Sequence, residues 1–455
     1  MRINDVLESR LASLRQAARR QLVAEFEEIG LQVDGGGRVA EDPGVFRGGQ
    51  HVPQIDIDLA QRIWNDTMRG VDDLCSRFES FYSLDPVALF VMGGPLDMRT
   101  IGTSPGASAD QERSPSLVTG RITYADEVPM HQVTGLVVGR EWEGGAAQAF
   151  RDGYVDPLKN GVPLQRGCLY ELSFAVSSWH EGTLKAIEDL GKIADVATAR
   201  FAGEFPPDPA PDGRAAVYGV AGVLATVAGF YGPVSLAANI VGLGLIAATD
   251  LDTHPADRTP ATDQIAVEGF RVADIVTSTG SAISTLQQLC GREDAALAKK
   301  LFEDVSLGEG FDSPKIKPGQ RPDLAAEPSL GPHSGGAVAA DVGAIYDAGR
   351  VHLPSAASEY RNASAMLGEC DPPPWLSLLF PKSPVWFDHA RDMLGKAFAS
   401  IAETLDECGA NLVTVANGYA AVDSASAAAI AQVPTDSPRP ASHAPTASRP
   451  TRGPF

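Results

Sequence analysis

Apolar residues recur along most of the chain at three- and four-residue steps, the spacing of one face of an α-helix. One such pattern covers residues 1–22, and a second begins at about residue 54. The second places these residues on one face: Ala60, Ile63, Thr67, Val71, Leu74, Phe78 and Phe81. Strand-like segments are confined to two short candidates, near residue 90 and at 117–125. The pattern predicts an all-α protein.

Two long helices are expected in the middle of the chain, at about 144–201 and 262–305. Pro157 and Pro163 should kink or interrupt the first of them early, because each removes an amide donor and crowds the preceding turn.

Two more helices are expected near the C-terminal end, at about 337–369 and 385–431. The second has the strictest pattern in the chain, because its steps of four and three residues alternate. Its apolar positions are Leu394, Phe398, Ile401, Leu405, Cys408, Leu412, Val415, Tyr419 and Val422. A mean step of about 3.5 residues is typical of a coiled-coil seam. These two helices should therefore form a helical hairpin.

Stretches rich in Pro and Gly divide the chain into units. The expected organisation is an N-terminal amphipathic helix with its linker (1–53, Gly-rich from 33), a helical domain (54–305), a linker (306–336), a C-terminal helical hairpin (337–432) and a disordered tail (433–455). The expected architecture is thus a set of long antiparallel helical hairpins that form bundles and are joined by Pro/Gly-rich linkers.

Residues 215–249 contain no charged residue. Pro233 divides this run into two arms of about sixteen residues, each short of the roughly 20 that span a bilayer. Glycines in both arms would permit close helix contact within a membrane. Two interpretations stay open, a buried helical hairpin covered by amphipathic helices and a hairpin inserted into a membrane.

Charge and cysteine content exclude some classes of function. A formal net charge of −21 in 455 residues would oppose contact with phosphates, so no nucleic-acid partner is expected. The five cysteines, Cys75, Cys168, Cys290, Cys370 and Cys408, have neither CxxC nor Cys/His spacing. No disulfide framework or zinc site is indicated, although one bridge between Cys370 and Cys408 stays open. The first helix lacks the apolar core and cleavage site of a Sec signal peptide.

Signatures of enzymes are weak or missing. GTSPG at 102–106 matches G-x-S-x-G formally, but Pro105 follows Ser104 where a nucleophile elbow needs a helix. Asp-x-Asp-x-His at 250–254 could supply metal ligands, yet at a domain edge such side chains are more often part of a solvated loop. His180 and Glu181 lack the second His of HExxH, and no nucleotide-binding glycine motif is present. No catalytic residue, metal or cofactor is therefore expected.

Trp142 and Gly144 form a Trp-x-Gly motif at the start of the long helix predicted over 144–201. Glycine permits a tight chain reversal, while the indole can cover the end of a helical hairpin and donate from its ring nitrogen. Five Trp and 46 Gly would produce about half a match by chance. The evidence for a functional motif is therefore its location at the start of a long predicted helix. The alternative is an ordinary core tryptophan in a helical bundle.

Tyr419 and Asp423 are four residues apart, so they lie on one face of the last predicted helix. A recognition protein could read ring and carboxylate together at this position, just before the expected tail. The alternative is that Tyr419 simply continues the apolar seam as a core residue.

The segment REWEGGAAQAF at 140–150 resembles the hairpin tip of the WXG family, with similarity extending over about 54–200. The last 95 or so residues before the tail are similar to small ESX-secreted helical-hairpin proteins, and Tyr419-x-x-x-Asp423 resembles the export signal of type VII substrates. The resemblance implies a secreted or cell-surface actinobacterial substrate, or secretion-associated interaction protein, of a type VII (ESX) system. Trp142, Gly144, Tyr419 and Asp423 would form a bipartite signal at one end of a four-helix bundle.

Two departures from the family pattern occur: a long insertion precedes the Trp-x-Gly, and Trp386 in the C-terminal hairpin has no Gly two residues later. Because both halves of the signal lie in one chain, the arrangement resembles fused PE/PPE-like substrates and implies export without a heterodimer partner. The expected partner is a type VII secretion ATPase or chaperone. Alternatives are a membrane-acting secreted effector that uses 215–249 and a cytoplasmic helical adaptor whose likeness reflects Ala-rich helices alone.

Overall fold

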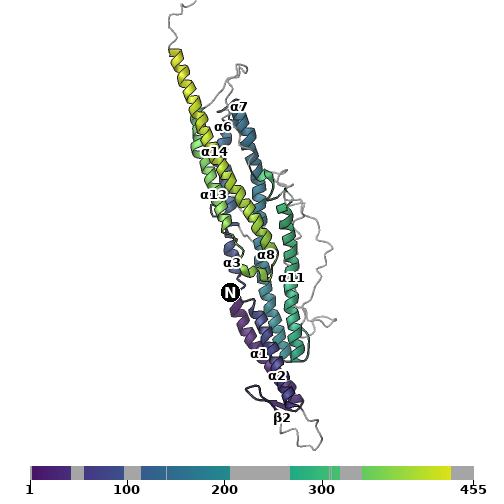
Figure 1. The fold of residues 1–455 in the computed structure, drawn as a ribbon. Helices are drawn as coiled ribbons and strands as arrows, with labels where there is room; N and C mark the ends of the chain where they lie inside the picture. The colour runs from purple at the N-terminus through teal and green to yellow at the C-terminus, as the bar shows by residue number, and fades with distance from the viewer. Residues whose placement is uncertain are drawn as a thin grey trace, which may run out of the picture.

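The computed structural model describes residues 3–41, 56–96, 114–139, 141–204, 267–306, 308, 310–317 and 341–431. Within these ranges 82% of the residues are helical and 2% lie in strands, so the fold class is all-α, as predicted. None of the helices in these ranges combines the length and the apolar character needed to cross a membrane. The helices form an elongated body (Figure 1).

Several features singled out in the sequence lie outside the described residues. They are the GTSPG segment at 102–106, the uncharged run at 215–249, the Asp-x-Asp-x-His at 250–254 and the tail at 433–455. Their interpretations stay predictions.

Helix α8 (Asp156–Phe201) extends through most of the body and continues α7 (Gly145–Phe150) through one π-turn, η3 (Arg151–Val155). The wide turn lies directly before Pro157, where it accommodates the missing amide donor. Pro163 lies inside α8 without ending it. The interruption expected from these prolines is therefore limited to one wide turn, and the helical stretch predicted over 144–201 is confirmed.

Four helical segments contact one another in the lower part of the body, where Figure 1 labels α1 and α2. They are α1 (Ile3–Glu28), α2 (Ile57–Glu79), α11 (Val272–Ser306) and the C-terminal half of α8. Both α1 and α11 contact α8 and α2. Arg10 Nε lies 2.9 Å from Asp195 Oδ1, which joins α1 to α8. The backbone N–H of Val272 donates to Glu25 Oε1 over 2.8 Å, which joins α11 to α1.

The other end of the body consists of the N-terminal half of α8, two helices that contact it (α5 and α14) and the helices that pack on those two. They are α5 (Val118–Glu127), α6 (Pro129–Val138), α12 (Val342–Asp347), the π-turn η5 (Ala348–His352), α13 (Leu353–Gly368) and α14 (Ser383–Ala431). Helix α13 packs along α14 and against α5. Ser364 Oγ donates to Gly395 O over 2.9 Å, while Gly349 lies against Gly409. Residue numbers rise along one helix as they fall along the other, so α13 and α14 run in opposite directions.

The seam predicted for α14 is confirmed over most of its length. The positions from Leu394 to Leu412 are fully buried, Val415 and Tyr419 are partly buried, and Val422 is 54% exposed. Helix α14 thus leaves the core near its C-terminal end.

Both strand candidates are helices in the structure, so that interpretation is wrong. The run near residue 90 forms α3 (Pro86–Met92), which begins at Pro86 and is capped by the Asp85 carboxylate accepting from the Val87 and Ala88 amides. The run at 117–125 lies largely in α5. Short apolar runs suit a buried helix as well as a strand. In α3 the proline and the aspartate cap favour the helix, whereas α5 has no side-chain cap.

The only strands among the described residues lie where a Gly-rich linker was expected. Strands β1 (Leu31–Val33) and β2 (Val39–Glu41) pair antiparallel around a turn at Asp34. Gly37 has φ +84°, and a Cβ there would lie 2.8 Å from Trp64 Nε1. Trp64 is buried beside this glycine. Ile63, which was predicted to lie on the apolar face of the helix, is exposed instead.

The expected domain units contact one another closely. One continuous core contains residues from both 54–305 and 337–432. Residues 310–317, inside the expected linker, pack on α8, where Ile316 is fully buried and its carbonyl accepts from Gln165 Nε2 over 2.8 Å.

Candidate functional site

The Trp-x-Gly segment forms the turn between α6 and α7. The Trp142 amide donates to Leu136 O over 3.1 Å, which turns the chain back over the end of α6. Gly144 is the N-cap of α7, with φ 123° and ψ −179°. Residues with a side chain almost never adopt this conformation, so the reversal depends on glycine at this position.

Trp142 is 1% exposed and begins a column of aromatic rings inside the bundle. Its ring centroid lies 5.8 Å from that of Phe150, and Phe150 lies 5.8 Å from Tyr154 in a stacked arrangement. The indole Nε1 and the Tyr154 hydroxyl are buried, and neither has a hydrogen-bond partner among the described residues. Trp142 therefore fixes the turn by packing, and the expected donation from its ring nitrogen has no acceptor in this part of the chain.

Tyr419 and Asp423 lie where α14 emerges from the bundle. Ala416 is the last fully buried position of the helix, and Tyr419 is partly buried against the core. Asp423, one turn further, is exposed. The ring thus contacts the bundle while the carboxylate faces solvent.

Helix α12 connects the Trp-x-Gly turn to this part of α14. The backbone N–H of Asp341, the N-cap of α12, donates to Glu141 O over 2.6 Å. Eight residues later, Gly349 lies against Gly409, Leu412 and Val413. Since both helices rise about 1.5 Å per residue and run in opposite directions, Asp341 lies level with the turn of α14 around Tyr419.

All four predicted signal residues therefore lie at the same end of the molecule, where Figure 1 shows α6, α7 and the C-terminal part of α14. No family model, curated protein or solved structure matches the chain. Trp142 and Gly144 form the turn, Tyr419 is partly buried against the core, and the Asp423 side chain is exposed.

The cysteines and the histidine considered for chemistry form no reactive or metal-binding group in the described ranges. Those ranges hold no cluster of three His, Cys, Asp or Glu side chains that could bind a metal ion. His180 Nδ1 lies 3.6 Å from Glu181 Oε1. All five thiols are buried and unbridged, so the Cys370–Cys408 disulfide that the sequence left open is not formed. Burial raises the pKa of the Cys370 thiol to about 12, which keeps it protonated.

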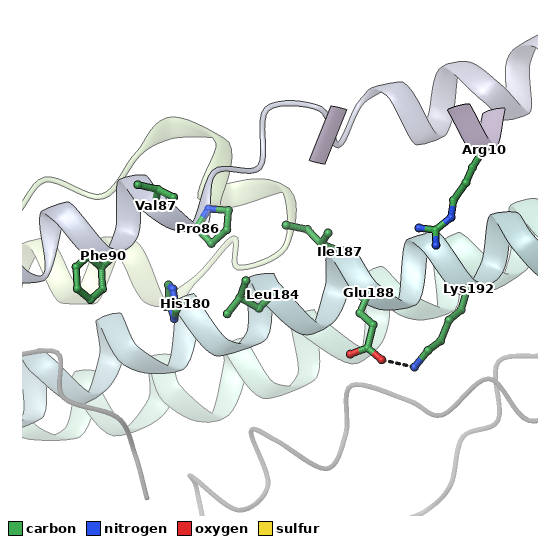
Figure 2. Close-up of a pocket in the computed structure, with 9 residues that line it drawn as sticks. All are labelled: Arg10, Pro86, Val87, Phe90, His180, Leu184, Ile187, Glu188 and Lys192. Carbon is green, nitrogen blue, oxygen red and sulfur yellow. Dashed lines mark hydrogen bonds and ion pairs between the residues drawn. The ribbon is translucent and has the colours of Figure 1, made fainter. Parts of the chain in front are cut away.

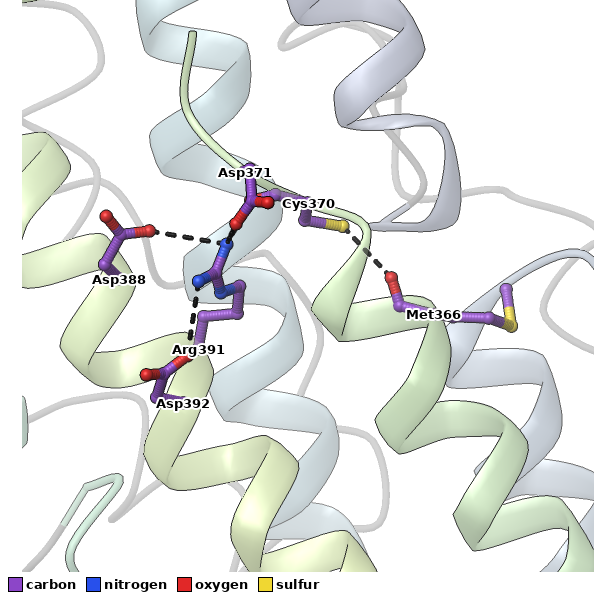
Figure 3. Close-up of polar contacts among 6 residues, drawn as sticks. All are labelled: Met366, Cys370, Asp371, Asp388, Arg391 and Asp392. Carbon is purple, nitrogen blue, oxygen red and sulfur yellow. Dashed lines mark hydrogen bonds and ion pairs between the residues drawn. The ribbon is translucent and has the colours of Figure 1, made fainter. Parts of the chain in front are cut away.

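A guanidinium holds the connection between α13 and α14 (Figure 3). Arg391 donates to Cys370 O over 3.0 Å and pairs with Asp371. It also lies 3.4 Å from Asp388 and 3.2 Å from Asp392. The cluster fixes the segment at which the chain reverses.

Sequence reasoning missed a buried polar contact between three long helices. Asp294 of α11, 1% exposed, accepts from the amides of Lys382 and Ser383, over 2.7 and 2.9 Å, and from the Ser383 hydroxyl. Trp179 Nε1 of α8 donates to the same hydroxyl over 2.9 Å. Asp294 thus caps the beginning of α14 from another helix, and no local sequence motif predicts this cap.

A second buried group joins α8 to α11. Lys300 Nζ lies 2.9 Å from Glu171 Oε1 and 2.8 Å from Asp304 Oδ2. Burial, followed by the hydrogen bond with Asp304, raises the pKa of Glu171 from 4.5 to about 8. Burial thus favours the protonated form of Glu171 in the folded chain.

This proton makes stability depend on pH. The unfolded chain releases it near pH 4.5 and the folded chain near pH 8, so stability present below pH 4.5 is lost progressively as pH rises to about 8. Glu171→Gln removes the ionisable group, so its melting temperature relative to the parent chain should climb over this range. Glu303→Gln, on α11 next to Asp304 with a 30% exposed side chain, is the control and should give a flat difference. A flat difference for Glu171→Gln as well would show that Glu171 does not titrate in this way.

Proposed function

We propose that the chain is a non-enzymatic substrate, or secretion-associated interaction protein, of a type VII (ESX) system, with Trp142, Gly144, Tyr419 and Asp423 as its export signal. The observation that carries this proposal is the convergence of the Trp-x-Gly turn and the emerging end of α14 at one end of the bundle. Residues almost 280 positions apart in sequence thereby lie at the same end of the bundle.

In this proposal the chain contains two antiparallel helical hairpins of the WXG kind. Helices α5 and α6 pair with α7 and α8 across the Trp-x-Gly turn, and α12 and α13 pair with α14. Packing of one hairpin on the other within a single chain replaces the heterodimer that separate partners would form. The protein would leave the cell, or reach its surface, as one folded unit.

Recognition follows from what the surface offers. Asp423 is exposed on a helix end that has left the core, so a cationic side chain of a secretion ATPase or chaperone can pair with it. Val422, 54% exposed, adds an apolar contact beside the carboxylate. Trp142 and Gly144 act indirectly, because they set the shape of the turn to which the N-cap of α12 is hydrogen-bonded through Glu141 O.

The turn can be tested with two neighbouring glycines. Gly144→Ala forces a side chain into a conformation that costs about 1–3 kcal/mol, so it should distort the turn and strongly reduce export. Gly145→Ala is the control, since a Cβ at that position meets open space and alanine favours the helix. The measurement is the secreted fraction of each variant in a host with a type VII system, together with its melting temperature. Equal secretion of the two variants, with Gly144→Ala measurably destabilised, would contradict a role for the turn in export.

A further inference from the structure

A groove far from the proposed signal lies between α1, α3 and α8 (Figure 2). Its volume is about 540 Å³, within the range of roughly 300–1,000 Å³ typical of sites for small ligands. The groove follows α8 from His180 to Lys192, a rise of about 18 Å. This length suits an extended chain molecule better than a compact one.

One end of the groove is apolar and unusually exposed. Val87 and Phe90 of α3 are 60% and 58% exposed, and Leu184 of α8 is 42% exposed. Helix α3 buries Leu89 and Met92 on its other side, so it is apolar on both faces. A helix that is apolar all round normally has both faces covered, and neighbouring exposed apolar side chains mark a binding site.

The other end of the groove is charged. Figure 2 shows Glu188, Lys192 and Arg10 gathered there, apart from Phe90, Val87 and Leu184. Lys192 pairs with Glu188, which also lies 3.0 Å from Lys185 Nζ.

Arg10 reaches this end because α8 has glycine opposite it. A Cβ on Gly191 would lie 2.3 Å from Arg10 Nη1, so any larger residue would displace the guanidinium. The carboxylate of Asp195 pairs with Arg10 Nε. A guanidinium has five N–H donors in all, so this pair leaves donors of Arg10 for a ligand. Ion pairs this exposed stabilise little, so the head group of a ligand can exchange with Glu188 or Asp195 at the two cations.

We propose that this groove binds a single-chain amphiphile with an anionic head, a free fatty-acid carboxylate, with its alkyl chain against Phe90, Val87 and Leu184 and its carboxylate at Arg10 and Lys192. The separation of an apolar end from a charged end that holds Arg10 and Lys192 in exposed ion pairs identifies the class of ligand. The site does not depend on the export proposal, because it shares no residue with it.

The test is calorimetric titration of the full chain with sodium laurate below its micelle concentration. The expected result is one laurate per chain, bound at least tenfold more weakly by Phe90→Asp and several-fold more weakly by Arg10→Gln. Val385→Asp, at a 55% exposed apolar position of α14 that does not line the groove, is the matched control and should bind like the parent chain. Val87→Asp serves in place of Phe90→Asp if that variant does not fold.

The anionic head is tested separately with lauryl maltoside, which has the same alkyl chain and no charge. The parent chain should bind lauryl maltoside at least tenfold more weakly than laurate. In the Arg10→Gln variant the difference in affinity between the two amphiphiles should be smaller. Absence of laurate binding, equal binding by the groove variants and the control, or equal affinity for the two amphiphiles would each overturn the proposal. A dimer in sedimentation that is lost with Phe90→Asp would also overturn it, because a second copy would then occupy the groove.

Discussion

Asp294→Ala should destabilise the protein by about 3 kcal/mol or more, the largest effect expected of any single substitution away from the apolar core. The carboxylate is 1% exposed and accepts hydrogen bonds from two backbone amides and one hydroxyl at the beginning of α14. Without it the amide and hydroxyl donors of Ser383 stay buried and unpaired, at a cost of about 1–3 kcal/mol each before relaxation. The helix also loses its cap, which is worth about 1 kcal/mol.

Urea denaturation of the parent chain and the variant measures this loss directly. Asp294→Asn keeps one acceptor oxygen and should lose markedly less than Asp294→Ala. Asp274→Ala, at an exposed position in the first turn of the same helix, should change stability by no more than about 0.5 kcal/mol. If Asp294→Ala behaves like Asp274→Ala, then Asp294 does not hold α14 in place.

Much of this fold could be predicted from the spacing of apolar residues. The seam of α14 from Leu394 to Leu412 and the long helix over 144–201 were predictable, because an amphipathic helix repeats its pattern over many turns. The short segments at 86–92 and 117–125 were not, because a segment of seven to nine residues is too short for its apolar spacing to separate a strand from a helix. There the outcome depends on caps and on the neighbours that tertiary packing supplies.

The candidate site divides in the same way. The need for glycine at position 144 follows from a chain reversal at the start of a helix. The position of Asp341 level with Tyr419 does not follow from the sequence, because it depends on the close approach of Gly349 and Gly409, which are 60 residues apart. Asp294 and Ser383 are likewise 89 residues apart, and neither belongs to a local motif. Contacts of this kind leave no periodic trace in one sequence.

Asp423→Ala should abolish export while leaving the fold intact. The carboxylate is exposed on the last turns of α14, beyond the final buried position at Ala416. Removing an exposed carboxylate at a helix end changes stability by only a few tenths of a kcal/mol. Tyr419→Ala is a poorer probe, because the ring packs partly against the core and its loss also costs stability.

The most direct measurement is the secreted against the cell-retained fraction of Asp423→Ala in a host with a type VII system, beside its melting temperature. Glu403→Ala, which removes an exposed carboxylate from the same helix well before the signal, is the matched control. The proposal predicts normal melting for both variants, normal secretion of Glu403→Ala, and retention of Asp423→Ala in the cell. Secretion of Asp423→Ala at the level of Glu403→Ala, with unchanged melting, would contradict it.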